Sequence, residues 1–271
     1  MPASPEAALT AVAAIGAVGQ VVSGAQLLAR PRWPDAGGWQ DWAVLRPGFR
    51  TGHLLPARFG ARAVMAVAGL RMVGGAAVLV AVALGLPLAP GVAAVVAANL
   101  VLTIRLPLGV TGADEMGHVV FAALLPAVLL ASPAVTRAAL AFVALQACLA
   151  YAAAGGAKLR ESGWRDGTSL RHVLATAGFG SARMARGLDR FPAAAGLLAR
   201  GIVLGEIAFP LVLLLPPGVA AVALGGVAAF HLVVAWVMGL NLFVWSFVAT
   251  LPAVAWLGGA IQAGWAAWGG A

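Results

Sequence analysis

Residues 151–167 read Tyr-Ala-Ala-Ala-Gly-Gly-Ala-Lys-Leu-Arg-Glu-Ser-Gly-Trp-Arg-Asp-Gly, and within this segment the chain changes from apolar to polar. The segment contains Lys158, the only lysine; every other basic residue is an arginine. Arginine keeps its proton in a protein, whereas a desolvated lysine can become a neutral base. Lys158 is therefore a candidate for proton chemistry. The alternative is that its ammonium extends to a membrane interface and takes part in no chemistry.

The composition of the chain identifies its class. Of 271 residues, 62% are hydrophobic and only 10% are charged, whereas soluble domains carry about 25% charged residues. This deficit predicts an integral membrane protein with several spans. The formal charge of +8 reflects membrane topology and not a nucleic-acid surface, because the basic residues cluster in two loops between predicted spans. The single cysteine, Cys148, permits no intrachain disulfide, and no Cys/His spacing predicts a metal site.

Apolar segments separated by Pro, Gly and charged residues predict an all-α, multi-pass transmembrane helix bundle of about eight spans in the cell membrane. It forms one domain over residues 1–271. The predicted spans are 7–29, 63–86, 91–108, 118–131, 138–156, 201–215, 219–238 and 242–262.

Eight spans place the loops 30–62, 109–117 and 157–200 on one membrane face. The first and last of these loops are rich in arginine, so the positive-inside rule makes that face cytoplasmic. Trp33, Trp39 and Trp42 in the first loop indicate a segment lying on the bilayer.

The last loop contains a stretch, about 169–188, that predicts an amphipathic helix on the membrane surface.

Arg71, Glu206 and His231 are ionisable residues inside predicted spans. Such groups are costly in hydrocarbon and usually face a bundle interior or a wet cavity. Arg71 and Glu206 are a plausible ion pair. The structural alternatives are that Glu206 joins helices and that His231 is a neutral histidine bonded to a backbone carbonyl.

The depth of these residues predicts a cavity that opens on the loop face. His231 lies seven residues before the end of its helix, roughly 10 Å deep at 1.5 Å per residue. Lys158 and His118 are expected at the mouth of the cavity. For Asp114, close to His118, the structural alternative to a site role is that its carboxylate places negative charge at a helix N-terminus. Gly155 and its neighbour Gly156 favour close helix packing.

Several motifs resemble the vitamin K-dependent gamma-carboxylase family, which includes the bacterial proteins with the HTTM (horizontally transferred transmembrane) domain. The first is Ala-Gly-Gly-Ala-Lys-Leu followed by Ser-Gly-Trp-Arg-Asp-Gly, within residues 154–167. The segment 105–118, Arg-Leu-Pro-Leu-Gly-Val-Thr-Gly-Ala-Asp-Glu-Met-Gly-His, is similar to the loop before the family's fourth span. Glu-Ile-Ala-Phe-Pro at 206–210, Phe-His at 230–231 and Gly-Leu-Asn-Leu-Phe at 239–243 are similar to its last three spans. Where the first span of the family usually carries an arginine, this chain has Gln20.

The resemblance implies a reduced naphthoquinone of the vitamin K or menaquinol type as cofactor and membrane lipid as surroundings. In the family, the lysine at the place of Lys158 deprotonates the quinol, oxygen converts it to a strong base, and glutamate of a peptide or protein substrate is carboxylated. His231 and His118 match histidines that assist. The cofactor or substrate pocket is expected to be formed by Asp114, Arg105, Trp164, Tyr151, Glu206 and Arg71. The animal enzyme works on the luminal side, so the resemblance and the positive-inside rule leave both orientations open.

Two other classes of function are considered. A non-enzymatic membrane protein would bind lipid, or a peptide partner for maturation or export, through its basic loops. A transporter would explain polar groups in spans, but the sequence shows no inverted repeat and no chain of intramembrane acids.

Overall fold

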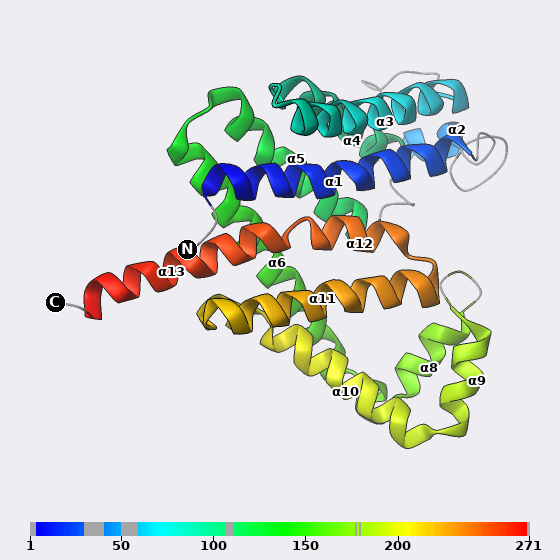
Figure 1. Cartoon of the computed structure of the whole chain (residues 1–271). Coiled ribbons are helices and arrows are strands. Elements are labelled where there is room, and N and C mark those ends of the chain that lie inside the picture. The colour runs from blue at the N-terminus through cyan, green and yellow to red at the C-terminus, as the bar shows by residue number, and fades with distance from the viewer. Residues whose placement is uncertain are drawn as a thin grey trace. The chain divides into compact units, whose positions relative to one another are not determined.

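The computed structural model describes residues 4–29, 41–49, 59–106, 111–176, 178 and 180–269, with side chains described as far as residue 264. Within these ranges the regular structure is helical and contains no strand (Figure 1). The chain divides into two compact units. Unit 1 comprises residues 1–8 and 140–271, and unit 2 comprises residues 9–139.

Unit 2 holds the first helices of the chain. They are α1 (Pro5–Leu28, most of which belongs here), α2 (Trp42–Leu45), the 3-10 helix η1 (Arg46–Gly48), α3 (Ala61–Leu84), α4 (Ala89–Arg105), α5 (Gly112–Leu130) and the start of α6 (Pro133–Arg160). Glycines let these helices approach closely. A Cβ at Gly91 of α4 would lie 2.9 Å from the Gly74 carbonyl oxygen of α3, so a side chain there would separate the two helices.

Unit 1 holds the remaining helices. They are the rest of α6, then α7 (Gly163–Asp166), α8 (Thr168–Ala175), α9 (Ala182–Arg190), α10 (Pro192–Ala208), the 3-10 helix η3 (Phe209–Leu214), α11 (Pro217–Met238), α12 (Asn241–Val248) and α13 (Leu251–Gly269). Proline occupies the first turn of α10 and of α11, where its missing N–H costs no hydrogen bond. Gly239 ends α11 with a φ of 70°.

The prediction of an all-α transmembrane bundle is confirmed. In the described part of the chain, seven helical segments are long and apolar enough to cross a membrane: α1, α3, α5, α6, α10 with η3, α11, and α12 with α13. The helix α4 is also apolar but has only 17 residues. It overlaps the predicted third span, 91–108, and so accounts for the eighth apolar segment.

Three predicted loop boundaries are wrong. Asp114 was placed in a loop over 109–117, but α5 begins at Gly112, and Thr111 and Asp114 form a capping box at its N-terminus. The helix α6 extends to Arg160, so Lys158 is in its last turn. The helix α10 begins at Pro192 and not at 201.

The tryptophan-rich loop is described only in part. Trp33 and Trp39 lie outside the described residues. Trp42 is buried, with its ring 5.7 Å from that of Phe59, so its side chain contacts protein. A folded contact inside unit 2 therefore replaces the expected lipid contact at this residue.

The predicted amphipathic helix over about 169–188 is replaced by two short helices, α8 and α9, which lie side by side (Figure 1). Their apolar residues Leu174, Ala185 and Leu188 pack with Ala195 of α10 and against Val237 and Met238 of α11. Leu174, Ala185 and Leu188 are thus covered by the protein itself, whereas Val173 of α8 and Met184 of α9 stay exposed. We call residues 163–190, from α7 to α9, the cap of unit 1.

Candidate functional site

Lys158 forms an ion pair with Glu206 inside unit 1. Its Nζ lies 2.8 Å from both carboxylate oxygens, Oε1 and Oε2. The Lys158 side chain is 24% exposed and that of Glu206 is 12% exposed, so the pair is sheltered but within reach of water. The predicted pairing of Arg71 with Glu206 is wrong, because Glu206 takes Lys158 as its partner.

Gly155 allows this pair to form. It lies one turn before Lys158 on α6, and a Cβ there would lie 2.9 Å from the Ile207 backbone nitrogen of α10 and 2.9 Å from the Glu206 Cβ. The prediction of close helix packing is confirmed at this residue. Gly156, by contrast, has nothing within 4 Å of a Cβ.

These two adjacent glycines supply a matched test. Gly155→Ala is expected to destabilise the protein by about 1–3 kcal/mol, because the new methyl group meets the backbone of a neighbouring helix. Gly156→Ala faces open space and is expected to be neutral or stabilising by up to about 1 kcal/mol, since alanine favours helix. Thermal unfolding in detergent, followed by circular dichroism, measures the difference; equal effects of the two substitutions would contradict the packing described here.

Trp164 lies beside the pair. Lys158 Nζ is 5.4 Å from the centre of its ring, which is a cation–π distance. The short helix α7 brings Trp164 there because Gly167, with a φ of 87°, turns the chain directly against α10. Next to that turn, the Thr168 amide donates a 2.9 Å hydrogen bond to Asp166, which lowers the pKa of the Asp166 carboxyl.

Tyr151 and His231 form a second polar contact of unit 1. The Tyr151 hydroxyl lies 2.5 Å from His231 Nε2. This nitrogen therefore bonds a side chain and not a backbone carbonyl, which was the structural alternative. His231 Nδ1 is buried and has no hydrogen-bond partner among the described residues. Phe247 stacks on the imidazole with ring centres 5.0 Å apart, and Phe209 packs on Tyr151 at 4.1 Å.

A groove of about 420 Å³ connects the two contacts. Tyr151 and Glu206 are its polar lining groups, and the rest of its wall is apolar: Leu197, Leu198, Gly201, Ile202, Gly205, Phe209, Ala223, Gly226, Val227 and Phe230. Leu197 and Leu198 are 67% and 53% exposed. The groove therefore opens along α10 and α11, beside these exposed leucines.

No known protein family, no curated protein and no solved structure matches this chain.

Unit 2 gathers a separate set of the predicted site residues. Arg71 is 3% exposed; its Nε donates a 2.7 Å hydrogen bond to Gln20 Oε1, and its Nη2 lies 3.7 Å from Asp114 Oδ1. Asp114 thus balances the charge of Arg71 as well as capping α5. This is the physical reason that Arg71 does not need Glu206.

His118 and Arg105 also lie in unit 2. His118 Nδ1 is 3.0 Å from the Thr103 hydroxyl of α4. Arg105 is fully buried, donates to the Phe59 carbonyl at 2.7 Å and lies 5.4 Å from the Trp42 ring centre. These contacts give Arg105 a structural role at the end of α4; a ligand-binding role for it stays a prediction.

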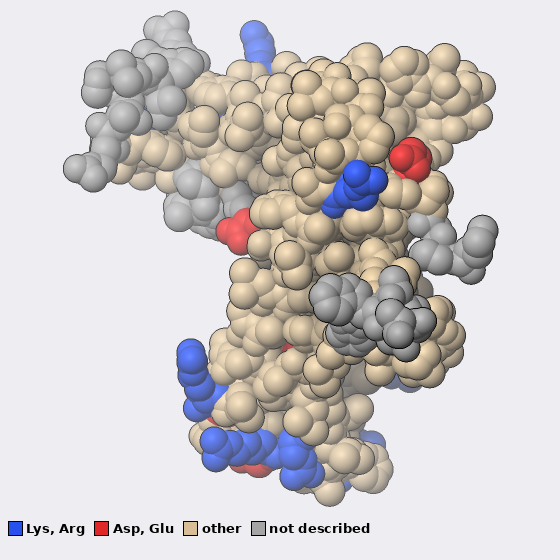
Figure 2. Space-filling view, turned by 90° about the vertical axis from the view of Figure 1, so that its left-hand side faces the viewer, with Lys and Arg blue, Asp and Glu red and all other residues tan. Residues whose placement is uncertain are grey.

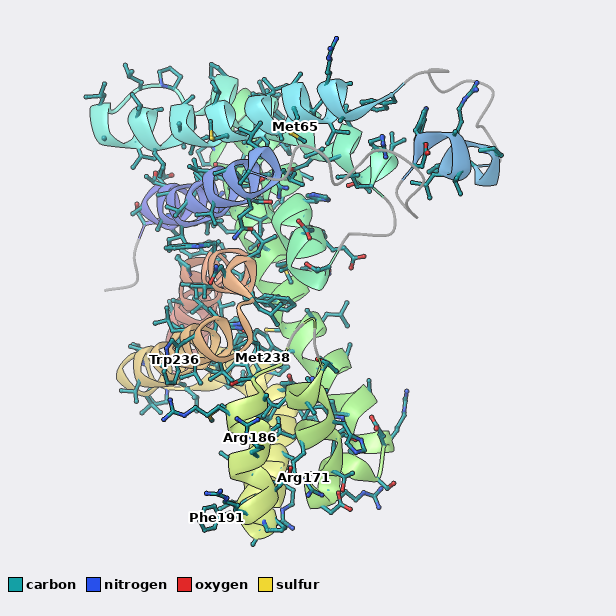
Figure 3. The ribbon with its side chains drawn as sticks, turned by 90° about the vertical axis from the view of Figure 1, so that its right-hand side faces the viewer. Met65, Arg171, Arg186, Phe191, Trp236 and Met238 are labelled. Atoms are coloured by element: carbon teal, nitrogen blue, oxygen red, sulfur yellow. The ribbon has the colours of Figure 1, made fainter. Side chains whose placement is uncertain are left out.

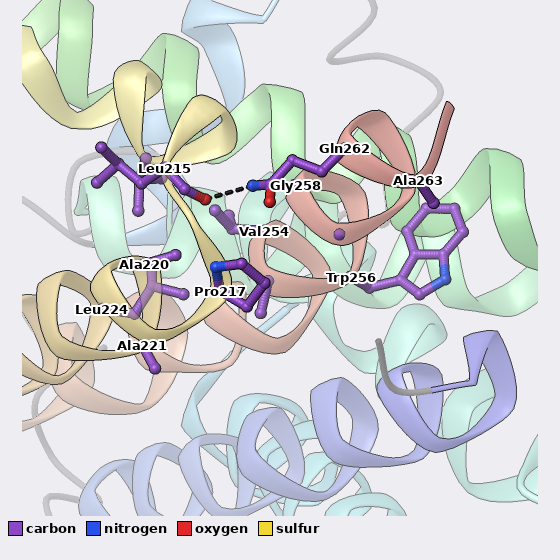
Figure 4. A pocket seen from close by; sticks show the side chains of 13 residues that line it. Leu215, Pro217, Ala220, Ala221, Leu224, Val254, Trp256, Gly258, Gln262 and Ala263 are labelled. Carbon is purple, nitrogen blue, oxygen red and sulfur yellow. Dashed lines mark hydrogen bonds between the residues drawn. The ribbon is translucent and has the colours of Figure 1, made fainter. Parts of the chain in front are cut away.

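A second cavity, of about 440 Å³, lies in unit 1 between η3, α11 and α13. Figure 4 shows Gln262 of α13 reaching across its wall, where the side-chain amide donates to the Leu215 carbonyl. The remaining lining is apolar, including Trp256 and Leu224. No group of three or more potential metal ligands occurs in the described ranges.

Sequence reasoning missed the aromatic residues that hold Tyr151 and His231. Phe209 and Phe247 pack on these two side chains, yet in an apolar span nothing distinguishes a site phenylalanine from one that contacts lipid. The Phe209-Pro210 dipeptide stands in one of the family-like motifs, and this was the one signal that could have pointed to Phe209.

Proposed function

We propose that this protein binds a reduced naphthoquinone of the menaquinol type in the groove of unit 1 and takes a hydroxyl proton from it with Lys158. The membrane concerned is the cell membrane. The observation that supports the proposal is the ion pair between Lys158 and Glu206, since Glu206 also lines an apolar groove open to lipid. A lipid-soluble reactant would thus arrive beside the only lysine of the chain.

The residues of the groove suit such a ligand. Small-molecule pockets are typically about 300–1,000 Å³, mainly apolar, with a few polar groups that orient the ligand. The groove has this size and two polar lining groups, Glu206 and Tyr151. Phe209 and Phe230 offer ring faces to a flat aromatic molecule. In this proposal Tyr151, held by His231, hydrogen-bonds one quinol oxygen, and the Lys158–Glu206 pair meets the other.

The charge of the pair determines how Lys158 can act as a base. As an ammonium bonded to Glu206 it has no lone pair and cannot accept a proton. An apolar ligand in the groove removes water, and the cost of keeping two separated charges then rises. Transfer of one proton from Nζ to the Glu206 carboxylate leaves a neutral amine and a neutral acid. The amine then accepts the hydroxyl proton of the ligand.

The family-like motifs extend the proposal to a carboxylase. When bound, the reduced naphthoquinone would react with oxygen, and this reaction would generate the strong base that removes a proton from glutamate. His118, Asp114, Arg71 and Arg105 lie in unit 2, so the chemistry proposed for the groove rests on residues of unit 1 alone. The substrate is a peptide or protein glutamate, and the chain is a gamma-carboxylase-like protein of the HTTM type.

Lys158→Arg is the variant that tests the base. Arginine keeps the positive charge and the bond to Glu206 but cannot lose its proton. We expect purified Lys158→Arg to bind menaquinone with little change, measured by quenching of tryptophan fluorescence. Its oxygen-dependent oxidation of menaquinol should fall about 10²–10⁴-fold, the usual contribution of a general base.

Arg160→Lys is the matched control, because Arg160 is exposed in the same helical turn and should keep full activity. A Lys158→Arg protein as active as the parent would remove Lys158 from the mechanism. A parent protein that binds no menaquinone would refute the whole proposal and would favour the non-enzymatic alternative. Incorporation of labelled carbon dioxide into a glutamate peptide tests the carboxylase extension separately.

A further inference from the structure

The helix α9 carries a stripe of arginines that the proposed chemistry does not use. Arg183, Arg186 and Arg190 are all exposed, and their spacing of three and four residues puts them on one face of the helix. The buried residues Ala185 and Leu188 occupy the opposite face. The three guanidinium groups therefore share a stripe about 10 Å long at 1.5 Å per residue.

In the described part of the chain, no acidic side chain pairs with the stripe. Among the described residues, none of Arg183, Arg186 and Arg190 has an acidic side chain within salt-bridge distance, whereas Arg171 on α8 pairs with Asp189 at 3.2 Å. Figure 2 shows Lys and Arg side chains gathered at the α8–α10 end of unit 1, while most of the remaining described surface in view is uncharged. Figure 3 labels Arg171, Arg186 and Phe191 at the same end. Three adjacent cations without partners favour a surface that supplies several negative charges.

The next residues along the chain lead from this stripe into the membrane. Phe191 is 67% exposed directly after Arg190. In α10, Arg200 is exposed on the same face as Leu197 and Leu204, which are 67% and 65% exposed. An arginine flanked by lipid-facing leucines extends its guanidinium to the headgroup level. The guanidinium group of Arg200 is therefore expected at the headgroup level, on the side of α10 that leads to the cap.

We propose that the arginine stripe of α9 and Arg200 of α10 together bind the headgroups of anionic phospholipids. Basic clusters next to a membrane span attract anionic lipid, and phosphate is the anion that arginine binds in a bidentate manner. The exposed Phe191 and leucines beside the arginines suit a lipid molecule, which has an acyl chain next to its phosphate. An acidic peptide would satisfy the charges but would leave these apolar side chains uncovered. Bound lipid would hold the cap, and with it Trp164, in place at the interface.

The test uses the full chain in neutral detergent with phosphatidylglycerol or phosphatidylcholine added. We expect phosphatidylglycerol to raise the unfolding temperature and to be retained in native mass spectra, and phosphatidylcholine to do neither at equal concentration. Arg186→Gln/Arg190→Gln should weaken the apparent affinity for phosphatidylglycerol by at least about tenfold, and Arg200→Gln by about fivefold, as expected near an anionic surface. Raising the salt concentration should also weaken the binding of phosphatidylglycerol to the parent protein.

Arg62→Gln/Arg137→Gln is the charge-matched control, because both of these arginines are exposed in unit 2, and it should keep the affinity of the parent. All variants should unfold at the parent temperature without lipid, since the substituted arginines have no ion-pair partner among the residues that the structure describes. Equal affinity for the two lipids, or an unchanged affinity in both the α9 double variant and Arg200→Gln, would overturn the proposal. Displacement of the lipid by inorganic phosphate or by polyglutamate at matched ionic strength would also overturn it, the latter in favour of an acidic protein partner.

Discussion

Glu206→Leu is expected to destabilise the protein by about 2 kcal/mol or more, and the double variant Lys158→Met/Glu206→Leu is expected to recover most of that loss. Removing one member of a sheltered ion pair leaves the other charge unpaired, which costs about 3–5 kcal/mol in a fully buried pair. The partial exposure of Lys158 and Glu206 lowers this expectation. Replacing both charges by apolar side chains of similar size leaves no unpaired group behind.

A double-mutant cycle measures this coupling from the parent, the two single variants and the double variant. The exposed pair of Arg171 with Asp189, in which Asp189 is 59% exposed, is the control, and Asp189→Leu should cost less than about 1 kcal/mol. Additive effects of Lys158→Met and Glu206→Leu would show that the two groups do not interact. The double variant should be stable yet inactive towards quinol, which separates the structural role of the pair from its proposed chemical role.

Gly167→Ala is expected to be among the most damaging single substitutions in unit 1. Two costs add at this position. Gly167 has a φ of 87°, and a Cβ there would lie 2.4 Å from the Ala195 carbonyl carbon of α10. The left-handed conformation alone costs an alanine about 1–2 kcal/mol, and the backbone of α10 must also shift. We expect a total above about 3 kcal/mol, and displacement of Trp164 from Lys158.

Gly239→Ala separates the two costs. Gly239 has a similar φ of 70°, but nothing lies within 4 Å of its Cβ position. It should therefore show the conformational cost alone. Chemical denaturation of both variants gives the difference, and the fluorescence of Trp164 can be isolated by comparing each variant with its Trp164→Phe derivative. If Gly167→Ala is no worse than Gly239→Ala, α7 does not pack on α10 as described.

The sequence predicted the helices well because membrane spans need long uninterrupted apolar segments, and these are visible without any tertiary information. It also identified Arg71, Glu206 and His231 as groups that must find partners, because ionisable side chains in hydrocarbon are costly. The helix ends at Gly112, Arg160 and Pro192 were misplaced, since a polar turn of a helix looks the same in sequence as a loop.

The partners of these residues could not be predicted. Arg71 pairs with Asp114 and Gln20, and Glu206 pairs with Lys158, although the sequence offered Arg71 and Glu206 as a pair. In an all-apolar helix the side chains carry no strong periodic signal that tells which face meets which neighbour. Phe209 and Phe247 were missed for the same reason.

By itself, then, the sequence determined that this chain is a multi-pass helical membrane protein with a single lysine at the edge of a span, because hydrophobicity and residue type are properties of the chain alone. The tertiary structure alone decided that Lys158 meets Glu206 beside an apolar groove and that the arginines of α9 share one uncovered stripe. Those outcomes depend on where glycines such as Gly155 and Gly167 let two helices approach, and such contacts join residues that lie far apart in the chain.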